Sequence, residues 1–418
     1  MNNQRLFYLA LIFIIGGFIK ISNLIYFMNY ILFDGSVRNQ LLPFTYTRPV
    51  ADLRVGILTI REKWERMLGY TTSSVTEDYL VDKFPMVEFN DNVFINASII
   101  PSENLVNMVS NLSENKAIFL NNEPVAFFAK KDQEVNFETY DVIEYSFNDI
   151  IKIEHNWDIF KFNGEAIKKD FQLLTSGRDS QPIPETTNVL NESQIFIEEG
   201  AVLPLCSLNA TDGPIYIGKD SEIMEGSLIR GPFALCNNAT IKMGAKIYGP
   251  TTIGPFSKMG GEINNCVIFG YTNKGHDGFL GNSVVGEWCN LGADTNNSNL
   301  KNNYAEVRLW DYETEGFAKT GLQFCGLMMG DHSKCGINTM FNTGTVIGVS
   351  ANIFGSGFPR NFIPSFSWGG YSGMITYKTV KAFEVAKVVM ERRNELFTEI
   401  DRQILEYIFE ETKRWRKD

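Results

Sequence analysis

Residues 217–259 read IGKDSEIMEGSLIRGPFALCNNATIKMGAKIYGPTTIGPFSKM, and every sixth residue from Ile217 to Met259 is aliphatic. Four places after these positions stand seven residues, of which six are small and one is Phe233. An α-helix repeats every 3.6 residues and a flat strand every 2, so neither accounts for a strict period of six. The pattern predicts a parallel β-helix, in which each hexad supplies one short strand and one corner, and three hexads complete a triangular coil.

The hexad pattern recurs from Phe279 to Leu291 and from Met329 to Ile353, with a weaker start at Ile197. We therefore expect the β-helix to cover about 190–370. The repeat is interrupted by polar or Gly-rich stretches, which we expect to leave the prism as loops: 208–214, 264–278 and 297–327. Loops on repeat scaffolds often carry the binding residues.

Two other regions flank the repeats. In residues 28–185, short apolar runs alternate with helical ones, which predicts an α/β, Rossmann-like domain with a mainly parallel sheet. The expected strands lie at 31–33 and 93–96, a hairpin turns at Asn121-Asn122, helices cover 57–68 and 102–112, and 181–185 is a linker. In residues 375–418, apolar residues at mostly four-residue steps predict one or two amphipathic helices that pack on the body or between subunits.

The net charge and the cysteines exclude some classes of function. The formal net charge is −11, which argues against a nucleic-acid partner, because such a protein needs a basic surface to neutralise phosphates. All six cysteines lie in the repeat region without a CxxC pair, so we expect reduced, structural thiols and no zinc site. Reduced thiols are typical of a cytoplasmic protein.

The first 27 residues allow two interpretations. Residues 6–27 are mostly apolar behind a polar, positively charged start, as in a membrane anchor or signal-like segment. Alternatively they are an over-extended start, because 28–34 already has the pattern of a first strand. A membrane association is expected only if the segment is a genuine anchor.

Histidine is scarce, with only His155, His276 and His332 in the chain. His276 lies in Asn273-Lys-Gly-His-Asp-Gly-Phe279, where the chain returns to the repeats. A neutral imidazole can accept a proton from an attacking amine or hydroxyl at neutral pH. The alternative is a surface histidine that bonds a neighbouring carbonyl.

The sequence motif KGHDGFLGN at 274–282 is followed by EWCNLGADT at 287–295. Together they resemble the acetyltransferase half of the bifunctional N-acetylglucosamine-1-phosphate uridyltransferase and glucosamine-1-phosphate acetyltransferase family. The resemblance implies a left-handed β-helix, a homotrimer, and acetyl-CoA as acyl donor. It places His276 on the catalytic histidine and Asn290 on a sugar-phosphate-binding asparagine, while Phe279 replaces a tyrosine. The implied reaction is direct transfer of the acetyl group to the sugar 2-amino group, without a metal.

Four further residues are candidates around this motif. Glu262 stands where the family also has an acidic residue, which implies a supporting role in substrate binding. Lys274 and Arg230 are candidate phosphate ligands, although an exposed cation on a prism is often only solvated. His332 is a second candidate base, and its alternative is a solvent-facing residue within a hexad.

The N-terminal part resembles the nucleotidyltransferase half more loosely. The family's glycine-rich phosphate loop has Gly35 and Arg38 as counterparts here, with one glycine missing and Phe44 in place of a lysine. Arg48, Arg54 and Arg61 are candidates for compensating phosphate contacts, or else structural partners of Asp34 and Asp52. The family's magnesium-binding aspartate has no counterpart in 96–101, so magnesium needs another ligand, such as Asp34, or uridyl transfer does not occur.

Three functions follow as hypotheses. The first is a sugar-phosphate acetyltransferase fused to a nucleotidyltransferase that uses a sugar 1-phosphate and a nucleoside triphosphate to make UDP-N-acetylglucosamine. The second is a UTP- or dTTP-dependent sugar-1-phosphate nucleotidyltransferase whose β-helix is not catalytic. The third is a scaffold without activity.

Overall fold

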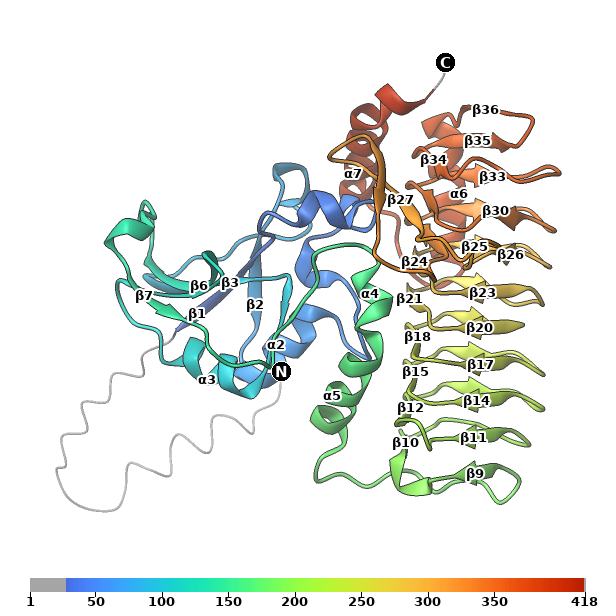
Figure 1. Cartoon of the computed structure of the whole chain (residues 1–418), viewed down its shortest axis with the longest axis horizontal. Helices are drawn as coiled ribbons and strands as arrows, with labels where there is room; N and C mark the ends of the chain where they lie inside the picture. Colours follow the sequence, from blue (N-terminus) through green and yellow to red (C-terminus); the bar gives the residue numbers. More distant parts are fainter. Residues whose placement is uncertain (1–27, 417–418) are drawn as a thin grey trace.

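The computed structural model describes residues 28–416, in which an α/β domain lies alongside a tall triangular prism (Figure 1). The apolar segment 1–27 lies outside the described residues. Among the helices of the described part, none is long and apolar enough to cross a membrane.

The first domain contains a six-stranded sheet. Its order is β2 (Thr72–Val75), β1 (Asn29–Phe33), β3 (Asp91–Asn96), β6 (Glu123–Lys130), β5 (Lys116–Leu120) and β7 (Asp141–Glu144). Only β6 is antiparallel to the other five strands. The expected mainly parallel sheet is therefore confirmed, and β5 and β6 form the predicted hairpin. A second, two-stranded sheet pairs β4 (Ile99–Ile100) with β8 (Ile151–Lys152).

The helices of this domain are α2 (Ile60–Leu68), α3 (Glu103–Ser110), α4 (Asp158–Lys161) and α5 (Asn163–Thr175). Helix α2 begins three residues later than predicted. Thr59 and Glu62 form a capping box at its start, and the backbone N–H groups of Ile57 and Leu58 donate to the buried Asp170 carboxylate instead of entering a helix.

The prism is a left-handed parallel β-helix with three faces, as predicted. The β10–β34 face contains β10 (Ile195–Ile197), β12 (Ile215–Ile217), β15 (Phe233–Leu235), β18 (Thr251–Ile253), β21 (Val267–Gly270), β24 (Val284–Glu287), β29 (Leu327–Met329), β32 (Thr345–Ile347) and β34 (Phe362–Ile363). The β13–β36 face contains β13 (Glu222–Ile223), β16 (Thr240–Ile241), β19 (Lys258–Met259), β22 (Asn273–Lys274), β25 (Asn290–Leu291), β30 (Lys334–Cys335), β33 (Asn352–Ile353), β35 (Ser367–Gly370) and β36 (Gly373–Thr376). The β9–β23 face contains β9 (Asn188–Leu190), β11 (Ser207–Asn209), β14 (Leu228–Arg230), β17 (Lys246–Tyr248), β20 (Glu262–Asn264) and β23 (Phe279–Gly281), and β26 (Asn296–Asn297) pairs with β31 (Met340–Phe341) beyond it.

The hexad residues fill the inside of the prism. All eight aliphatic positions from Ile217 to Met259 are buried, and the small residues four places later are buried at the corners. Each buried aliphatic side chain contributes about 1.5–3 kcal/mol, so the stacked coils provide a continuous core. The six cysteines are buried and unpaired with one another, as expected.

The three interruptions behave differently. Residues 297–327 leave the prism and carry the antiparallel hairpin of β27 (Arg308–Asp311) and β28 (Gly316–Lys319), as predicted. The prediction of a loop at 264–278 is wrong. There the coils continue through β21 and β22, and Ile253 pairs with Ile268 and Ile268 with Val285, steps of 15 and 17 residues. The shorter of these two coils contains the corner at Gly260 and Gly261, where the backbone of the next coil approaches closely. The interruption at 208–214 only lengthens one coil.

The first domain packs on the β10–β34 face of the prism. Helix α5 runs along the lower part of this face (Figure 1), and its residues Ile167 and Leu174 share a core with Phe196, Tyr216 and Ala234 of the prism. Higher up, Phe44 of the first domain contacts Phe269 at a ring separation of 5.2 Å. The two domains therefore share buried apolar surface.

The predicted C-terminal helices are α6 (Thr379–Glu391) and α7 (Glu399–Glu411). Helix α6 covers part of the β13–β36 face. Helix α7 lies against the first domain, where Tyr407 stacks on Tyr79 at 4.0 Å between ring centroids. Both helices thus pack on the body of the molecule.

Candidate active site

A cavity of about 780 Å³ lies between the β13–β36 face and the end of α6. Its lining is strongly basic, with five cationic side chains and no carboxylate: Lys242, Lys258, Lys334, Arg392 and Arg393. Within residues 28–416, none of the five forms an ion pair. In a chain with a net charge of −11, such a group of unneutralised cations favours an anion.

The cations of this cavity repel one another. Burial, followed by the nearby Arg393 and Lys242 charges, lowers the pKa of Lys258. Burial, followed by Arg392, lowers the pKa of Arg393, whose Nη2 donates to Asn273 Oδ1 at 2.9 Å. Opposite charges favour the protonated form, so an anionic ligand would relieve both effects.

His276 lies at the edge of this cavity. It follows β22 at the corner that leads to β23, and its side chain is exposed to solvent. Asn290 lines the same cavity from β25, whose neighbour β22 pairs Asn273 with Asn290. The structure thus brings the predicted base and the predicted sugar-phosphate residue to one cavity, together with the five cations.

Lys274 does not line the cavity. It pairs with Met259 of the previous coil and points into the prism, where it is 1% exposed. Its Nζ donates to the carbonyl oxygens of Gly260, His276 and Gly278 at 3.2, 3.0 and 2.7 Å. Lys274 therefore supports the turn that carries His276 from below, whereas the sequence suggested a direct substrate contact.

The buried ammonium of Lys274 predicts a distinctive pH dependence of stability. Burial lowers its pKa from 10.5 to about 8, so between these two pH values the unfolded chain binds a proton that the folded chain does not. Stability should therefore rise with pH across this window, by at most about 3 kcal/mol at about 1.4 kcal/mol per pKa unit.

The measurement is urea unfolding at pH 7, 8, 9 and 10 for the wild type and Lys274→Met. The wild type should gain stability relative to Lys274→Met as the pH rises, because the variant has no ammonium to deprotonate. The exposed Lys246→Met, on the neighbouring face, serves as the control and should run parallel to the wild type. Parallel curves for all three proteins would show that Lys274 is not held in this environment.

Three predicted residues lie on the adjacent β9–β23 face, away from the basic cavity. Glu262 accepts a hydrogen bond from the Tyr248 hydroxyl at 2.6 Å and pairs with Phe279 in the next coil. Arg230 lies 3.6 Å from Asp212 and is exposed. Glu262 and Arg230 line a separate cavity of about 750 Å³ on that face. The structure thus separates these residues from the basic cavity.

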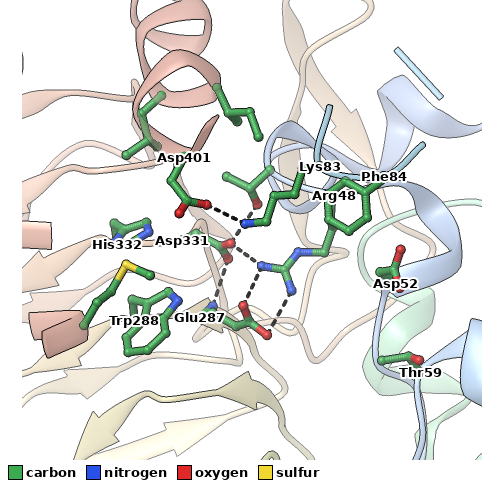
Figure 2. Close-up of a pocket in the computed structure, with 14 residues that line it drawn as sticks. Arg48, Asp52, Thr59, Lys83, Phe84, Glu287, Trp288, Asp331, His332 and Asp401 are labelled. Carbon is green, nitrogen blue, oxygen red and sulfur yellow. Dashed lines mark hydrogen bonds and ion pairs between the residues drawn. The ribbon is translucent and has the colours of Figure 1, made fainter. Parts of the chain in front are cut away.

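Arg48 and His332 both line a cavity at the junction of the first domain, the prism and α7 (Figure 2). The buried Arg48 guanidinium is paired with the carboxylates of Asp331 and Glu287, and Thr47 also donates to Asp331 at 2.7 Å. Burial lowers the pKa of His332 to about 3, so its imidazole is neutral. Arg48 therefore joins the domains, and His332 lies in this junction instead of facing solvent.

The other candidate phosphate ligands are also engaged by protein groups. Gly35 follows β1 at a φ of 67°, in the left-handed region that favours glycine. Arg38 donates to Asp34 and to the Thr45 carbonyl. Arg54 donates to the carbonyls of Ile57 and Phe269. Arg61 forms a two-point pair with Asp52, as the structural alternative anticipated.

The two arginines that follow α6, Arg392 and Arg393, were not predicted from the sequence. Arg392 and Arg393 end an amphipathic segment, and adjacent cations at a helix end were the available signal. Their proximity to the repeats depends on how α6 folds back. Lys242, Lys258 and Lys334 stand next to hexad positions, but only the coil register shows that they share a face.

Comparison with known proteins agrees with these domains. Residues 30–179 match the family model described as sugar nucleotidyl transferase. The bifunctional protein GlmU of Methanococcus maripaludis strain C5 is 29% identical over 201 residues, 48% of this chain and 42% of that protein. The predicted resemblance is confirmed.

Two further proteins are similar to part of the chain. The putative uncharacterized acetyltransferase YaiX of Escherichia coli K12 is 30% identical over 144 residues, 34% of this chain and 61% of that protein. A solved UDP-N-acetylglucosamine acyltransferase from Campylobacter jejuni aligns with 55% of this chain and 96% of its own at 14% identity, with a TM-score of 0.26. The chain spans less than two thirds of the length of the two curated relatives.

Proposed function

We propose that the prism transfers an acetyl group from acetyl-CoA to the 2-amino group of glucosamine 1-phosphate at the basic cavity beside His276. The observation that carries this proposal is the grouping of His276 and Asn290 with five unpaired cations in one cavity. Both substrates bear phosphate, and charge-assisted contacts to phosphate are among the stronger hydrogen bonds in proteins.

In the proposed reaction, His276 accepts a proton from the sugar amine as its nitrogen attacks the thioester carbonyl carbon. The carbon–sulfur bond then breaks, and coenzyme A leaves as a thiolate that takes the proton from the imidazolium. No acyl-enzyme forms. A general base of this kind contributes about 10²–10⁴-fold to the rate.

Arg392 and Arg393, which follow α6, are expected to bind the substrate phosphates. Replacing both in Arg392→Ala/Arg393→Ala should raise KM about 10- to 100-fold with a smaller change in kcat, because a hydrogen bond to a charged group contributes about 1.5–3 kcal/mol. Initial rates at varied acetyl-CoA and sugar phosphate would measure this. Lys381→Ala, an exposed cation at the other end of α6, should leave KM unchanged. An equal effect of both variants would indicate a general charge effect and contradict the assignment.

The match of residues 30–179 to sugar nucleotidyl transferases favours a second activity, uridyl transfer to the acetylated sugar phosphate to form UDP-N-acetylglucosamine. Gly35 and Arg38 would lie at its nucleotide site. The magnesium that the resemblance implies does not fit the residues present. Both oxygens of Asp34 already accept hydrogen bonds, from Val50, Arg38 and Thr76.

Two assays of the full chain decide between the activities. One follows thiol release from acetyl-CoA with glucosamine 1-phosphate, and the other follows pyrophosphate release from UTP with N-acetylglucosamine 1-phosphate. Thiol release that depends on the amino sugar supports the proposal. Pyrophosphate release alone would favour a nucleotidyltransferase with a non-catalytic prism, and neither product would favour a scaffold.

The proposal includes the homotrimer that the resemblance implies and the cytoplasmic location that the reduced cysteines indicate. We propose a homotrimer in the cytoplasm, which sedimentation of the full chain and cell fractionation would test.

A further inference from the structure

The basic cavity beside His276 has two unlike halves along the axis of the prism. Lys258 pairs with Asn273, which lies in the coil of His276. Lys242 belongs to the coil before that of Lys258. Arg393, just after α6, donates to Asn273. These cations therefore lie at the coil of His276 and the two coils before it, and we call this part of the cavity the cationic half.

The coils after His276 present apolar side chains to the same cavity. Strand pairing places Ala293 and then Ile337 at the position of His276 in the next two coils. Both residues line the cavity, and Ile337 is 67% exposed. Neighbouring strands lie about 4.8 Å apart, so Ile337 stands about 10 Å along the axis from His276. The wall of the prism thus changes from charged to apolar at the predicted base.

Helix α6 supplies the opposite wall of the cavity. Val385, Val389 and Arg392 line it at helical spacing, and therefore from one side of this segment. The helix begins beside the last strands of the prism, where Tyr377 contacts a ring of β35 at 4.6 Å between centroids, and it ends near the coil of His276. Its two valines consequently lie opposite the apolar coils. Together with Ala293 and Ile337 they form what we call the apolar half.

One cation, Lys334, belongs to the coils of the apolar half. Its Nζ donates to the carbonyl oxygens of His332 and Trp288 at 2.9 and 3.5 Å, so the ammonium is held against the backbone of the prism. The remaining lining of this half is able to bury apolar surface of a ligand. The whole cavity therefore suits a ligand with an anionic part at one end, an apolar chain at the other, and its reactive atom beside His276.

We propose that the apolar half receives the acyl chain of the donor thioester, and that butyryl and hexanoyl groups are used in preference to acetyl. This assignment, which rests on the proposed acyl transfer at His276, leaves the chemistry unchanged. The amine nitrogen bonds to the thioester carbon, the carbon–sulfur bond breaks, and the proton passes through the imidazole to the thiolate. The chain then extends from His276 past Ala293 toward Ile337, between the prism and the valines of α6.

Titration calorimetry of the full chain with acetyl-CoA and hexanoyl-CoA tests the proposal, because the two thioesters differ only in the length of the acyl chain. Each methylene group that is buried against the apolar half should tighten binding by up to about fourfold, which corresponds to about 0.8 kcal/mol. We expect hexanoyl-CoA to bind at least about tenfold tighter than acetyl-CoA. Equal binding, or tighter binding of acetyl-CoA, would overturn the proposal.

Variants distinguish the apolar half from unspecific attraction of an acyl chain to the protein surface. Ile337→Asn places an amide in this half and is expected to lower the ratio of the two affinities about tenfold. Its matched control is Met243→Asn, at the same corner two coils before that of His276. Met243 is 71% exposed and does not line the cavity, so the ratio should stay unchanged. Equal losses in both variants, or no loss in Ile337→Asn, would contradict the assignment.

Binding and turnover give separate answers. Tighter binding of hexanoyl-CoA without thiol release from either thioester would contradict the proposed transfer and support the apolar half as an acyl-chain site. Thiol release from acetyl-CoA, together with equal affinities for the two thioesters, would support the transfer and overturn the acyl-chain site.

Discussion

His276→Ala is expected to lower kcat for acetyl transfer by about 10²–10⁴-fold, the contribution of a positioned general base. Another lining group of the cavity is Lys334, whose pKa burial lowers to about 8. Lys334 Nζ donates to the His332 and Trp288 carbonyls, so it is held by the prism backbone. No second base is thus positioned to replace His276.

The measurement is steady-state thiol release at pH 7.5 with saturating acetyl-CoA. KM for acetyl-CoA should change little in His276→Ala, because the cations that would bind its phosphates remain. His155→Ala, a partly exposed histidine of the first domain, is the matched control and should retain full activity. An unchanged kcat in His276→Ala would refute the catalytic assignment, while pyrophosphate release should be unaffected in either variant.

Asp331→Ala is expected to destabilise the folded chain by about 3–5 kcal/mol, the typical cost of leaving a buried charge unpaired. Asp331 is 3% exposed and accepts hydrogen bonds from Arg48, Thr47 and the Glu287 backbone N–H. Without it, the buried Arg48 guanidinium keeps only Glu287, whose side chain is partly exposed. The stability is lost at the contact between the two domains, because Arg48 belongs to the first domain and Asp331 to the prism (Figure 2).

Urea unfolding followed by intrinsic fluorescence measures this change. Glu384→Ala, which breaks the exposed pair with Lys381, is the control and should cost less than about 1 kcal/mol. The double variant Arg48→Met/Asp331→Asn should be less destabilised than the sum of its single changes, because it no longer buries an unpaired charge. Additive effects would show that the two side chains do not interact.

The repeat could be read from the chain because it depends on local periodicity, whereas His276 was singled out by its motif. A side chain at every sixth place must point inward for the coils to close, and the structure buries all eight of them. The shortened coils were harder to foresee. In the sequence, a hexad that lacks a residue cannot be distinguished from the start of a loop. Here Gly260 and Gly261 form a shorter corner, and the chain does not leave the prism.

Charged residues were predicted less well, since their partners lie far away in the sequence. Lys274 looks like a surface cation in its motif, but its pairing with Met259 turns it into the prism. Arg48 looks like a phosphate ligand, yet its carboxylate partners stand 239 and 283 residues later. The formation of an ion pair depends on packing between domains, which no short pattern contains.

The sequence by itself determined the β-helix and the α/β domain, because both follow from the spacing of neighbouring residues. Only the tertiary structure decided that α6 folds back over the β13–β36 face and adds Arg392 and Arg393 to the cavity of His276. It also decided that the first domain docks on the prism through Arg48. These arrangements depend on contacts between segments more than 100 residues apart, whose free energy is not encoded in any local period.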